Sequence, residues 1–199
     1  MTKRFQNFRL SEALVLGGSF NPPHAGHLHI AKTALKRTSI KQVIVMPAKQ
    51  NPFKKHITNQ SFDVRFEKCK DLFLTSTCKK YQIFLSDFEN FSNDFETFFV
   101  LSNFCKQNPS IRTSWLMGLD CVSKFFKWGC FSNFVNLFPI VIVSRGSCKQ
   151  KINYLNSTTV KILKNRICYN PRYYNQKSIL FIDGRNVDIS STKIRESRQ

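Results

Sequence analysis

Short apolar runs recur along the chain and alternate with amphipathic stretches. Between the first two runs, Leu28, Ala31 and Leu35 recur at the spacing of one helical face, and a helix is expected to begin near Ala25. A strand, a helix and a strand in that order form a unit with parallel strands and a right-handed crossover. The pattern therefore predicts a doubly wound parallel α/β sheet of five or six strands. The runs expected to form buried strands are 13–16, 42–47, 81–85, 113–117, 139–144 and 179–182.

Two later stretches also carry apolar residues at helical spacing. Ser61 precedes the first and the pair Asn93-Asp94 precedes the second, and each is expected to cap its helix through a side-chain oxygen. The aromatic and cysteine side chains within these stretches are assigned to the core. Residues 147–176 are polar, basic and poorly periodic, so no chemistry is assigned to them.

Length and composition fit one domain. A chain of 199 residues, 42% of them hydrophobic, is long and apolar enough to bury a substantial core. The longest apolar run, 137–143, contains a proline and is far shorter than the ~18 residues of a membrane span, so no membrane partner is expected. Seven cysteines without a Cys-x-x-Cys pair argue against a disulfide framework and a zinc ribbon. Reduced thiols in a cytoplasmic protein are the simplest account.

The charge balance points to anionic partners. The sequence has 31 basic and 12 acidic residues, a net charge of +19, which favours nucleotides or nucleic acid as partners. The basic residues are spread along the chain in pairs and form no long block. A dedicated nucleic-acid-binding arm is therefore not indicated, and no specific nucleic acid is expected.

The most informative stretch joins the first apolar run to the helix after it. It reads Gly17-Gly18-Ser19-Phe20-Asn21-Pro22-Pro23-His24-Ala25-Gly26-His27. The glycines let the backbone turn tightly and approach a ligand, and the helix start presents free N–H groups and the positive end of its dipole. His24 and His27 are three residues apart, so they share a face and can reach one ligand. The stretch predicts a phosphate-sized anion site beside two imidazoles.

Other interpretations of this stretch are open. The histidines can serve only as helix caps beside a tight turn. Zinc can bind a histidine pair, but no Cys, Asp or Glu lies nearby in the sequence to complete a site, and no metal site is predicted. The stretch is neither a P-loop nor a dinucleotide fingerprint, because neither glycine pattern is present.

A second motif lies near the C-terminal end, Ile189-Ser190-Ser191-Thr192-Lys193-Ile194-Arg195. Ser190 is placed to cap a final helix, while Ser191 and Thr192 present hydroxyls at its start. Arg195, four residues after Ser191, lies on the same face and adds a planar, permanently charged guanidinium. These groups can converge on one anion. A capped helix that carries a basic residue is the structural alternative.

The two motifs together resemble those of the bacterial nicotinate-mononucleotide adenylyltransferases, in the nucleotidyltransferase superfamily. The first is similar to the GGSF(D/N)PxHxGH form of the superfamily's (T/H)xGH signature, and the second to the ISSTxIR motif. The resemblance implies a Rossmann-like nucleotidyltransferase fold in a single domain, 1–199. It also implies transfer of the adenylyl group of ATP to nicotinate mononucleotide in NAD biosynthesis, with Mg²⁺ arriving with ATP. An oligomer is compatible with the sequence.

The resemblance also implies roles for individual residues. The catalytic residues it implies are His24, His27 and Arg195. The ATP-binding residues it implies are Gly17, Gly18, Ser19, Phe20, Lys54, Gly118, Asp120, Arg145, Ser190, Ser191 and Thr192. The residues it implies for nicotinate mononucleotide are Asn21, Thr97 and Trp128, with the indole of Trp128 stacking on the pyridine ring.

One position departs from the family pattern. The family usually carries Thr-x-x-Thr before the helix that contacts the pyridine nucleotide, and this chain has Asp94 at the first threonine and Thr97 at the second. A carboxylate near an anionic substrate is unfavourable unless it points away. Another adenylyltransferase of the superfamily, with nicotinamide mononucleotide or pantetheine phosphate as acceptor, is the alternative assignment, although the usual motifs of the pantetheine-phosphate enzymes fit less well. A non-catalytic, basic nucleic-acid-binding protein is a further alternative, against which the two intact motifs argue.

Overall fold

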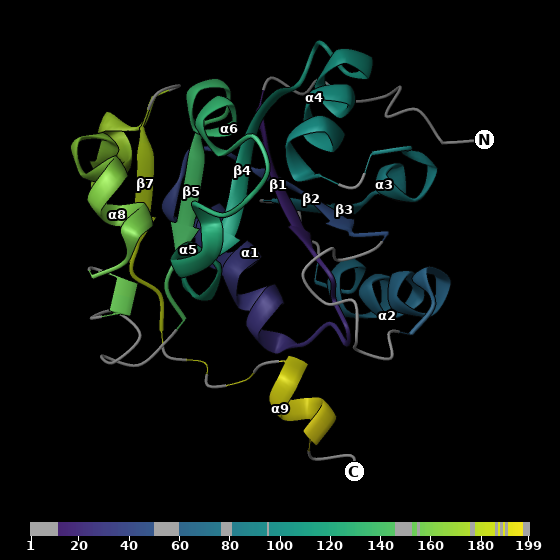
Figure 1. Cartoon of the computed structure of the whole chain (residues 1–199). Coiled ribbons are helices and arrows are strands. Elements are labelled where there is room, and N and C mark those ends of the chain that lie inside the picture. The colour runs from purple at the N-terminus through teal and green to yellow at the C-terminus, as the bar shows by residue number, and fades with distance from the viewer. Residues whose placement is uncertain are drawn as a thin grey trace.

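The computed structural model describes residues 12–49, 60–76, 81–94, 96–145, 153–154, 156–175, 178–185, 187, 189 and 191–196. Within these residues the centre of the molecule is a seven-stranded sheet in the order β3-β2-β1-β4-β5-β7-β6, with every pair parallel (Figure 1). The strands are β1 (Glu12–Gly18), β2 (Gln42–Pro47), β3 (Gln82–Leu85), β4 (Arg112–Gly118), β5 (Ile140–Val143), β6 (Ile167–Cys168) and β7 (Ile179–Ile182). The doubly wound parallel sheet is confirmed. The short edge strand β6 lies within 147–176, where the sequence predicted no element.

Helices cover both faces of the sheet. One face carries α1 (Ala25–Arg37) and α2 (Phe62–Leu74), and the other carries α4 (Thr97–Gln107), α5 (Leu119–Phe125), α6 (Phe131–Leu137) and α8 (Thr158–Leu163). The short helix α3 (Phe88–Phe91) follows β3. The last helix, α9 (Ser191–Glu196), lies at the foot of the molecule below α1 (Figure 1). None of the described helices is long and apolar enough to span a bilayer.

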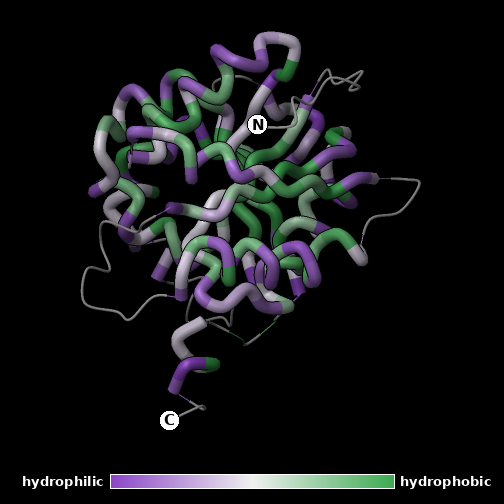
Figure 2. The backbone as a smooth tube through the Cα atoms, turned by 90° about the vertical axis from the view of Figure 1, so that its right-hand side faces the viewer, coloured by the Kyte–Doolittle hydropathy of each residue, from purple (hydrophilic) through white to green (hydrophobic). Residues whose placement is uncertain are grey.

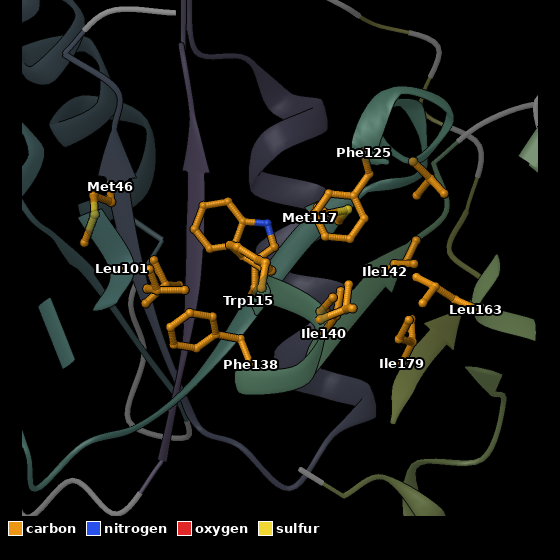
Figure 3. Packing of buried hydrophobic residues seen from close by; sticks show 14 of the residues in the cluster. Met46, Leu101, Trp115, Met117, Phe125, Phe138, Ile140, Ile142, Leu163 and Ile179 are labelled. Carbon is orange, nitrogen blue, oxygen red and sulfur yellow. The ribbon is translucent and has the colours of Figure 1, made fainter. Parts of the chain in front are cut away.

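Each strand supplies two cores because successive side chains point to opposite faces of the sheet. In β1, Ala13 and Val15 face the α4–α8 side, while Leu14 and Leu16 face α1 and α2. The apolar interior and the polar exterior are visible along the backbone in Figure 2. Figure 3 shows the first core, in which Trp115 lies at the centre of the packed side chains.

The two predicted helix starts have different outcomes. Ser61 caps α2, since its side chain accepts a hydrogen bond from the Val64 N–H. The prediction for Asn93-Asp94 is wrong, because α4 begins at Thr97 with Glu96 as its N-cap. Asp94 instead accepts a hydrogen bond from Asn103 Nδ2 at 2.7 Å. A partner nine residues away thus holds the carboxylate that was expected to cap the helix.

The order of the strands locates the site. The chain runs outward from β1 to β2 and β3 on one side, and from β4 to β5 on the other. The direction in which strands are added therefore reverses between β1 and β4. In open α/β sheets a ligand binds at such a point, outside the carboxyl ends of the strands. The carboxyl ends of β1 and β4 are Gly18 and Gly118, and both belong to predicted ATP-binding motifs.

Candidate active site

The site is built on the turn that follows β1. Gly17 packs against the Trp115 indole so closely that a Cβ there would lie 2.1 Å from Cη2, and therefore only glycine fits. Phe20 then turns the backbone with φ 45°, a left-handed conformation that costs about 1–2 kcal/mol in a residue with a side chain. Its ring is 1% exposed and meets the His27 ring edge-on, with the centroids 4.8 Å apart. Burial of this ring favours the strained turn.

His24 and His27 cap α1 through their ring nitrogens. His24 Nδ1 accepts from the Gly26 N–H at 3.1 Å, and His27 Nδ1 accepts from the His24 N–H at 3.2 Å. The two ring centroids are 3.8 Å apart, so the structure brings the predicted pair together. A ring nitrogen that accepts a hydrogen bond carries no proton, so the N–H of each ring is at Nε2. The helix backbone thus leaves two Nε2–H donors side by side.

His24 is held in its neutral form. Its pKa is lowered from 6.5 to about 4, mainly by burial and then by the positive charge of Arg145, while the negative charge of Asp120 opposes the shift. The imidazole therefore stays uncharged at neutral pH. It can donate from Nε2 without changing its protonation state. A donor fixed in this way needs no reorganisation when negative charge develops beside it.

Arg145 lies over the start of α1. Its Nη2 forms an ion pair with Asp120 Oδ2 at 2.9 Å, and its Nη1 donates to the Ile189 carbonyl at 2.5 Å. A Cβ on Gly26 would lie 2.3 Å from Nη1, so Gly26 makes room for the guanidinium. The Arg145 carbonyl also accepts from the Val187 N–H at 2.9 Å. Arg145 therefore connects the end of β5 to the chain that leads into the C-terminal motif.

Asp120 remains accessible beside this ion pair. Its side chain is 46% exposed, and it follows Gly118 at the carboxyl end of β4. A Cβ on Gly118 would lie 2.4 Å from Asp120 Oδ1, so the glycine allows the carboxylate to fold back over the strand end. The carboxylate lies at the edge where the resemblance places the nucleotide.

The C-terminal motif docks on the β1–α1 turn. Ser191 Oγ donates to the Pro22 carbonyl at 2.9 Å, and Arg195 Nη1 donates to the Asn21 carbonyl at 2.5 Å. Arg195 Nη2 also contacts Thr192 Oγ1 at 3.3 Å. The two predicted motifs, separated by most of the chain, are therefore in direct contact. Of the remaining ATP-binding predictions, Lys54 and Ser190 lie outside the described residues.

Two of the three residues predicted for the mononucleotide lie on the α4–α8 side of the sheet. Thr97 begins α4, and the partly buried Trp128 lies between α5 and α6, edge-on to Phe125 with the centroids 5.0 Å apart. Trp128 is also edge-on to Trp115 at 6.1 Å, and Trp115 packs on Gly17. Trp115 therefore connects Trp128 to the β1–α1 turn. Asn21, the third residue predicted for this substrate, is buried in the turn and accepts from the C-terminal arginine through its carbonyl.

A carboxylate lies between Thr97 and Trp128. The Glu96 carboxylate lies so close to Gly129 that a Cβ on this glycine would be 2.1 Å from Oε2. Glu96 is exposed and makes no cap hydrogen bond at the start of α4. Asp94, the acidic residue that the sequence pattern places at this end, is held by Asn103. Glu96 is therefore the acidic side chain that faces the Trp128–Gly129 segment.

The sequence analysis also missed Arg65. This side chain on α2 is buried and donates to the Ser19 carbonyl in the β1–α1 turn at 2.7 Å. A signal was present, because Arg65 precedes Cys69 by four residues and so shares its apolar helix face. A charged residue on such a face indicates a specific buried partner.

The chain is similar to known proteins over most of its length. A family model described as cytidylyltransferase-like matches residues 15–197. A protein from Clostridium botulinum (strain Okra / Type B1), named "Probable nicotinate-nucleotide adenylyltransferase", is 32% identical over 182 residues, which cover 91% of this chain and 84% of the relative. A protein of the same name from Agrobacterium fabrum is 30% identical over 190 residues, 93% of this chain and 98% of the relative.

Solved structures share the fold at lower sequence identity. The Plasmodium falciparum nicotinic acid mononucleotide adenylyltransferase complexed with NaAD superposes with a TM-score of 0.67 at 20% identity, and covers 94% of this chain and 83% of its own. The same enzyme complexed with APC gives a TM-score of 0.67 at 19% identity with the same coverage. The Rossmann-like architecture predicted from the sequence is thereby confirmed.

Proposed function

Because the chain belongs to the cytidylyltransferase-like family and shares 30–32% identity with nicotinate-nucleotide adenylyltransferases, we propose that it transfers the adenylyl group of ATP to nicotinate mononucleotide. The products are nicotinate adenine dinucleotide and pyrophosphate, in a step of NAD biosynthesis. The two Plasmodium structures, complexed with NaAD and with APC, agree with a dinucleotide product and a nucleotide substrate.

One observation carries the assignment of the site. The hydrogen bonds from Ser191 and Arg195 to the carbonyls of Pro22 and Asn21 bring the C-terminal motif onto the turn that holds the histidines. Because Asn21 closely precedes His24 in the sequence, this contact places Arg195 beside the turn that leads to the two Nε2–H donors at the start of α1. We assign this combination of a guanidinium, two imidazoles and a helix N-terminus to the triphosphate of ATP.

The chemistry needs positioning more than proton transfer. A phosphate oxygen of the mononucleotide attacks the α-phosphorus of ATP in line and forms a new P–O bond. The bond from the α-phosphorus to the bridging oxygen breaks, and pyrophosphate leaves with that electron pair. The attacking phosphate is already an anion, so no general base is required. His24 and His27 donate to the phosphates and to the charge that develops on the bridging oxygen.

The other residues hold the two nucleotides in place. Arg195, with Ser191 and Thr192, binds the β- and γ-phosphates, and Lys54 is assigned the same role. The exposed carboxylate of Asp120 accepts from the ribose hydroxyls of ATP. Mg²⁺ is part of the MgATP substrate, where it neutralises phosphate charge. The described residues contain no group of three His, Cys, Asp or Glu side chains that could hold a metal ion.

A second acceptor, nicotinamide mononucleotide, is favoured by one observation. The Glu96 carboxylate beside Gly129 would repel the carboxylate of nicotinate but not the neutral amide of nicotinamide. The net charge of +19 favours the acid in general. We retain nicotinate mononucleotide as the substrate because the similar proteins carry that activity in their names.

The setting inferred for the protein is the cytoplasm. The five cysteines within the described part of the chain, Cys69, Cys105, Cys121, Cys130 and Cys168, are free thiols. Free thiols are the state expected in a reducing compartment.

Pyrophosphate release tests the proposal. The protein is incubated with MgATP and, in separate reactions, nicotinate mononucleotide, nicotinamide mononucleotide or phosphopantetheine, with a reaction lacking acceptor as the control. The highest kcat/KM is expected with nicotinate mononucleotide, and the dinucleotide product is identified by mass spectrometry. RNA binding is measured in parallel. Release with no acceptor, or RNA binding without any release, would overturn the assignment.

A further inference from the structure

Arg65 is a buried cation whose described hydrogen bonds all go to main-chain carbonyls. The side chain is 4% exposed, on the face of α2 that packs against the sheet. Nη1 donates to Ser19 O and to Ala48 O, each at 2.7 Å, and Nη2 donates to Lys49 O at 3.0 Å. Nε donates to Gln60 O at 3.1 Å. One guanidinium thus binds three separate segments of the chain.

Lysine or a neutral side chain could not make these contacts. Four carbonyls in different directions match the planar fork of arginine, whereas an ammonium has three donors on one atom. Arg65 Cζ lies over the Phe62 ring, 5.6 Å from its centroid. Burial makes the charge unfavourable and lowers the pKa of Arg65, with Glu89 opposing that shift. A charge kept under these conditions indicates that its geometry is needed.

The carboxylate near this guanidinium acts on the same loop. Glu89 Oε1 accepts from the Lys49 N–H at 3.2 Å, while the Lys49 carbonyl accepts from Arg65. Both sides of one residue in the loop after β2 are therefore fixed. The pKa of Glu89 is raised to about 7 by burial, with the Lys49 hydrogen bond and the Arg65 charge opposing the shift. Arg65 and Glu89 thus hold the same loop residue from its carbonyl and its N–H.

The contact with Ser19 sets the direction of the next peptide group. The Ser19–Phe20 bond is trans, so its carbonyl and its N–H point in opposite directions. Arg65 binds the Ser19 carbonyl, so the Phe20 N–H of the same peptide group must point away from Arg65. Phe20 is also the residue with the left-handed φ of 45°. Its ring packs between His27 and Phe73 and so also fixes the turn.

We propose that Arg65 is a positioning residue for the triphosphate of ATP, acting through the peptide group it holds at Ser19. Fixing this peptide keeps the glycine-rich turn in its ligand-binding shape and directs the Phe20 N–H toward the phosphates. The bonds to Ala48, Lys49 and Gln60 hold the loop after β2 and the start of α2 against the same turn. The proposal rests on the proposed function, since it assumes that ATP binds at this turn.

Arg65→Lys tests the proposal because it keeps the charge and loses the fork. Displacement of a binding group by about 1 Å can lower the rate about 10²-fold, and kcat/KM for ATP is expected to fall on that scale. KM for the mononucleotide is expected to stay unchanged. A calorimetric titration with a non-hydrolysable ATP analogue, without the mononucleotide, is expected to show weaker binding. This readout separates the two proposals, because it does not depend on turnover by the wild-type protein.

Lys70→Met is the matched control. Lys70 lies on the same helix and carries the same charge, but its ammonium is exposed and pairs with Glu67 Oε2 at 3.2 Å. Its ATP kinetics are expected to match the wild type. Arg65→Gln, which keeps a planar donor, serves if the lysine variant does not fold, as judged by circular dichroism. Unchanged analogue binding in a folded variant overturns the proposal, and so does loss of the fold in both variants, because Arg65 would then serve stability alone.

Discussion

The two ends of the candidate site differ in how their side chains are held and in the charge that they carry. The phosphate end consists of the β1–α1 turn with Asp120, Arg145, Ser191 and Arg195, and its side chains bind the backbone of distant segments. The pyridine end consists of Glu96, Thr97, Trp128 and Gly129. There the described contacts are mainly ring packing, and a carboxylate faces the Trp128–Gly129 segment.

This difference separates catalysis from substrate choice. Every adenylyl transfer handles the same triphosphate, so the groups that bind it can be fixed by the protein before the substrate arrives. The base attached to the acceptor varies between substrates, and the contact surface proposed for it here is the half-buried indole of Trp128. Changes at the phosphate end should therefore reduce turnover with every acceptor. Changes at the pyridine end should alter the preference between acceptors.

The largest effect is expected from His27→Ala. Loss of one preorganised donor typically lowers kcat by about 10²–10³-fold, and a loss of this scale is expected with nicotinate and nicotinamide mononucleotides alike. Steady-state kinetics with both acceptors provide the measurement. His29→Ala is the control, since His29 is on the same helix but contacts Thr33 on α1. A folded His27 variant with normal kcat would remove the histidine from the mechanism.

A smaller, acceptor-specific effect is expected from Trp128→Ala. Stacking of a base on an aromatic ring contributes about 1–3 kcal/mol, so KM for the mononucleotide should rise about 5- to 160-fold while KM for ATP changes little. Trp128→Phe keeps a ring face and the packing against Phe125, and should restore most of the affinity. If KM for ATP rises equally, Trp128 supports the core and not the pyridine ring.

Most of the fold could be predicted from the sequence because most of its strands are short apolar runs that can be recognised locally. The runs 13–16 and 42–47 are apolar and bounded by polar or proline residues, and the structure has β1 and β2 there. Strand β6 is only Ile167–Cys168, and a two-residue strand leaves no run to recognise. Its pairing with β7 depends on the packing of the sheet edge, which no local pattern encodes.

The site was predictable where a motif spans it and not where distant residues build it. The histidine pair and the C-terminal motif were identified from their spacing, and the structure brings them together. Asp94 was misassigned as a cap because Asn103 competes for its carboxylate. Arg65 was missed because its partner Ser19 lies 46 residues away, and sequence periodicity contains no information about such pairs.

A still smaller effect is expected from Glu96→Gln. An exposed charge contributes about 0.2–1 kcal/mol, so removing it should raise the preference for nicotinate over nicotinamide mononucleotide by roughly 1.5- to 5-fold. Competition between the two acceptors measures the ratio directly. Glu67→Gln, an exposed change on α2, provides a control at the same net charge. An unchanged ratio would show that the Glu96 carboxylate does not face the bound pyridine ring.

The smallest effect on activity is expected from a change of pH between 8 and 6 at the phosphate end, although stability should respond at lower pH. The pKa of His24 is lowered to about 4 by burial and by Arg145, so its ring should not titrate between pH 8 and 6. Below pH 6.5 the unfolded chain takes up a proton that the folded chain refuses, so stability should fall as the pH drops toward 4 and return as it rises. At about 1.4 kcal/mol per pKa unit, the loss reaches about 3 kcal/mol.

Two measurements check this expectation. An NMR titration of the His24 ring should give a midpoint near pH 4, and urea unfolding should give a lower free energy at pH 4.5 than at pH 6.5. His24→Asn keeps a helix-capping oxygen and removes the titrating ring, so it should flatten this dependence. A midpoint near pH 6.5 would mean that the ring is charged in the folded protein at mildly acidic pH. The charge at the phosphate end would then depend on pH. The two ends of the site would differ only in how their side chains are packed.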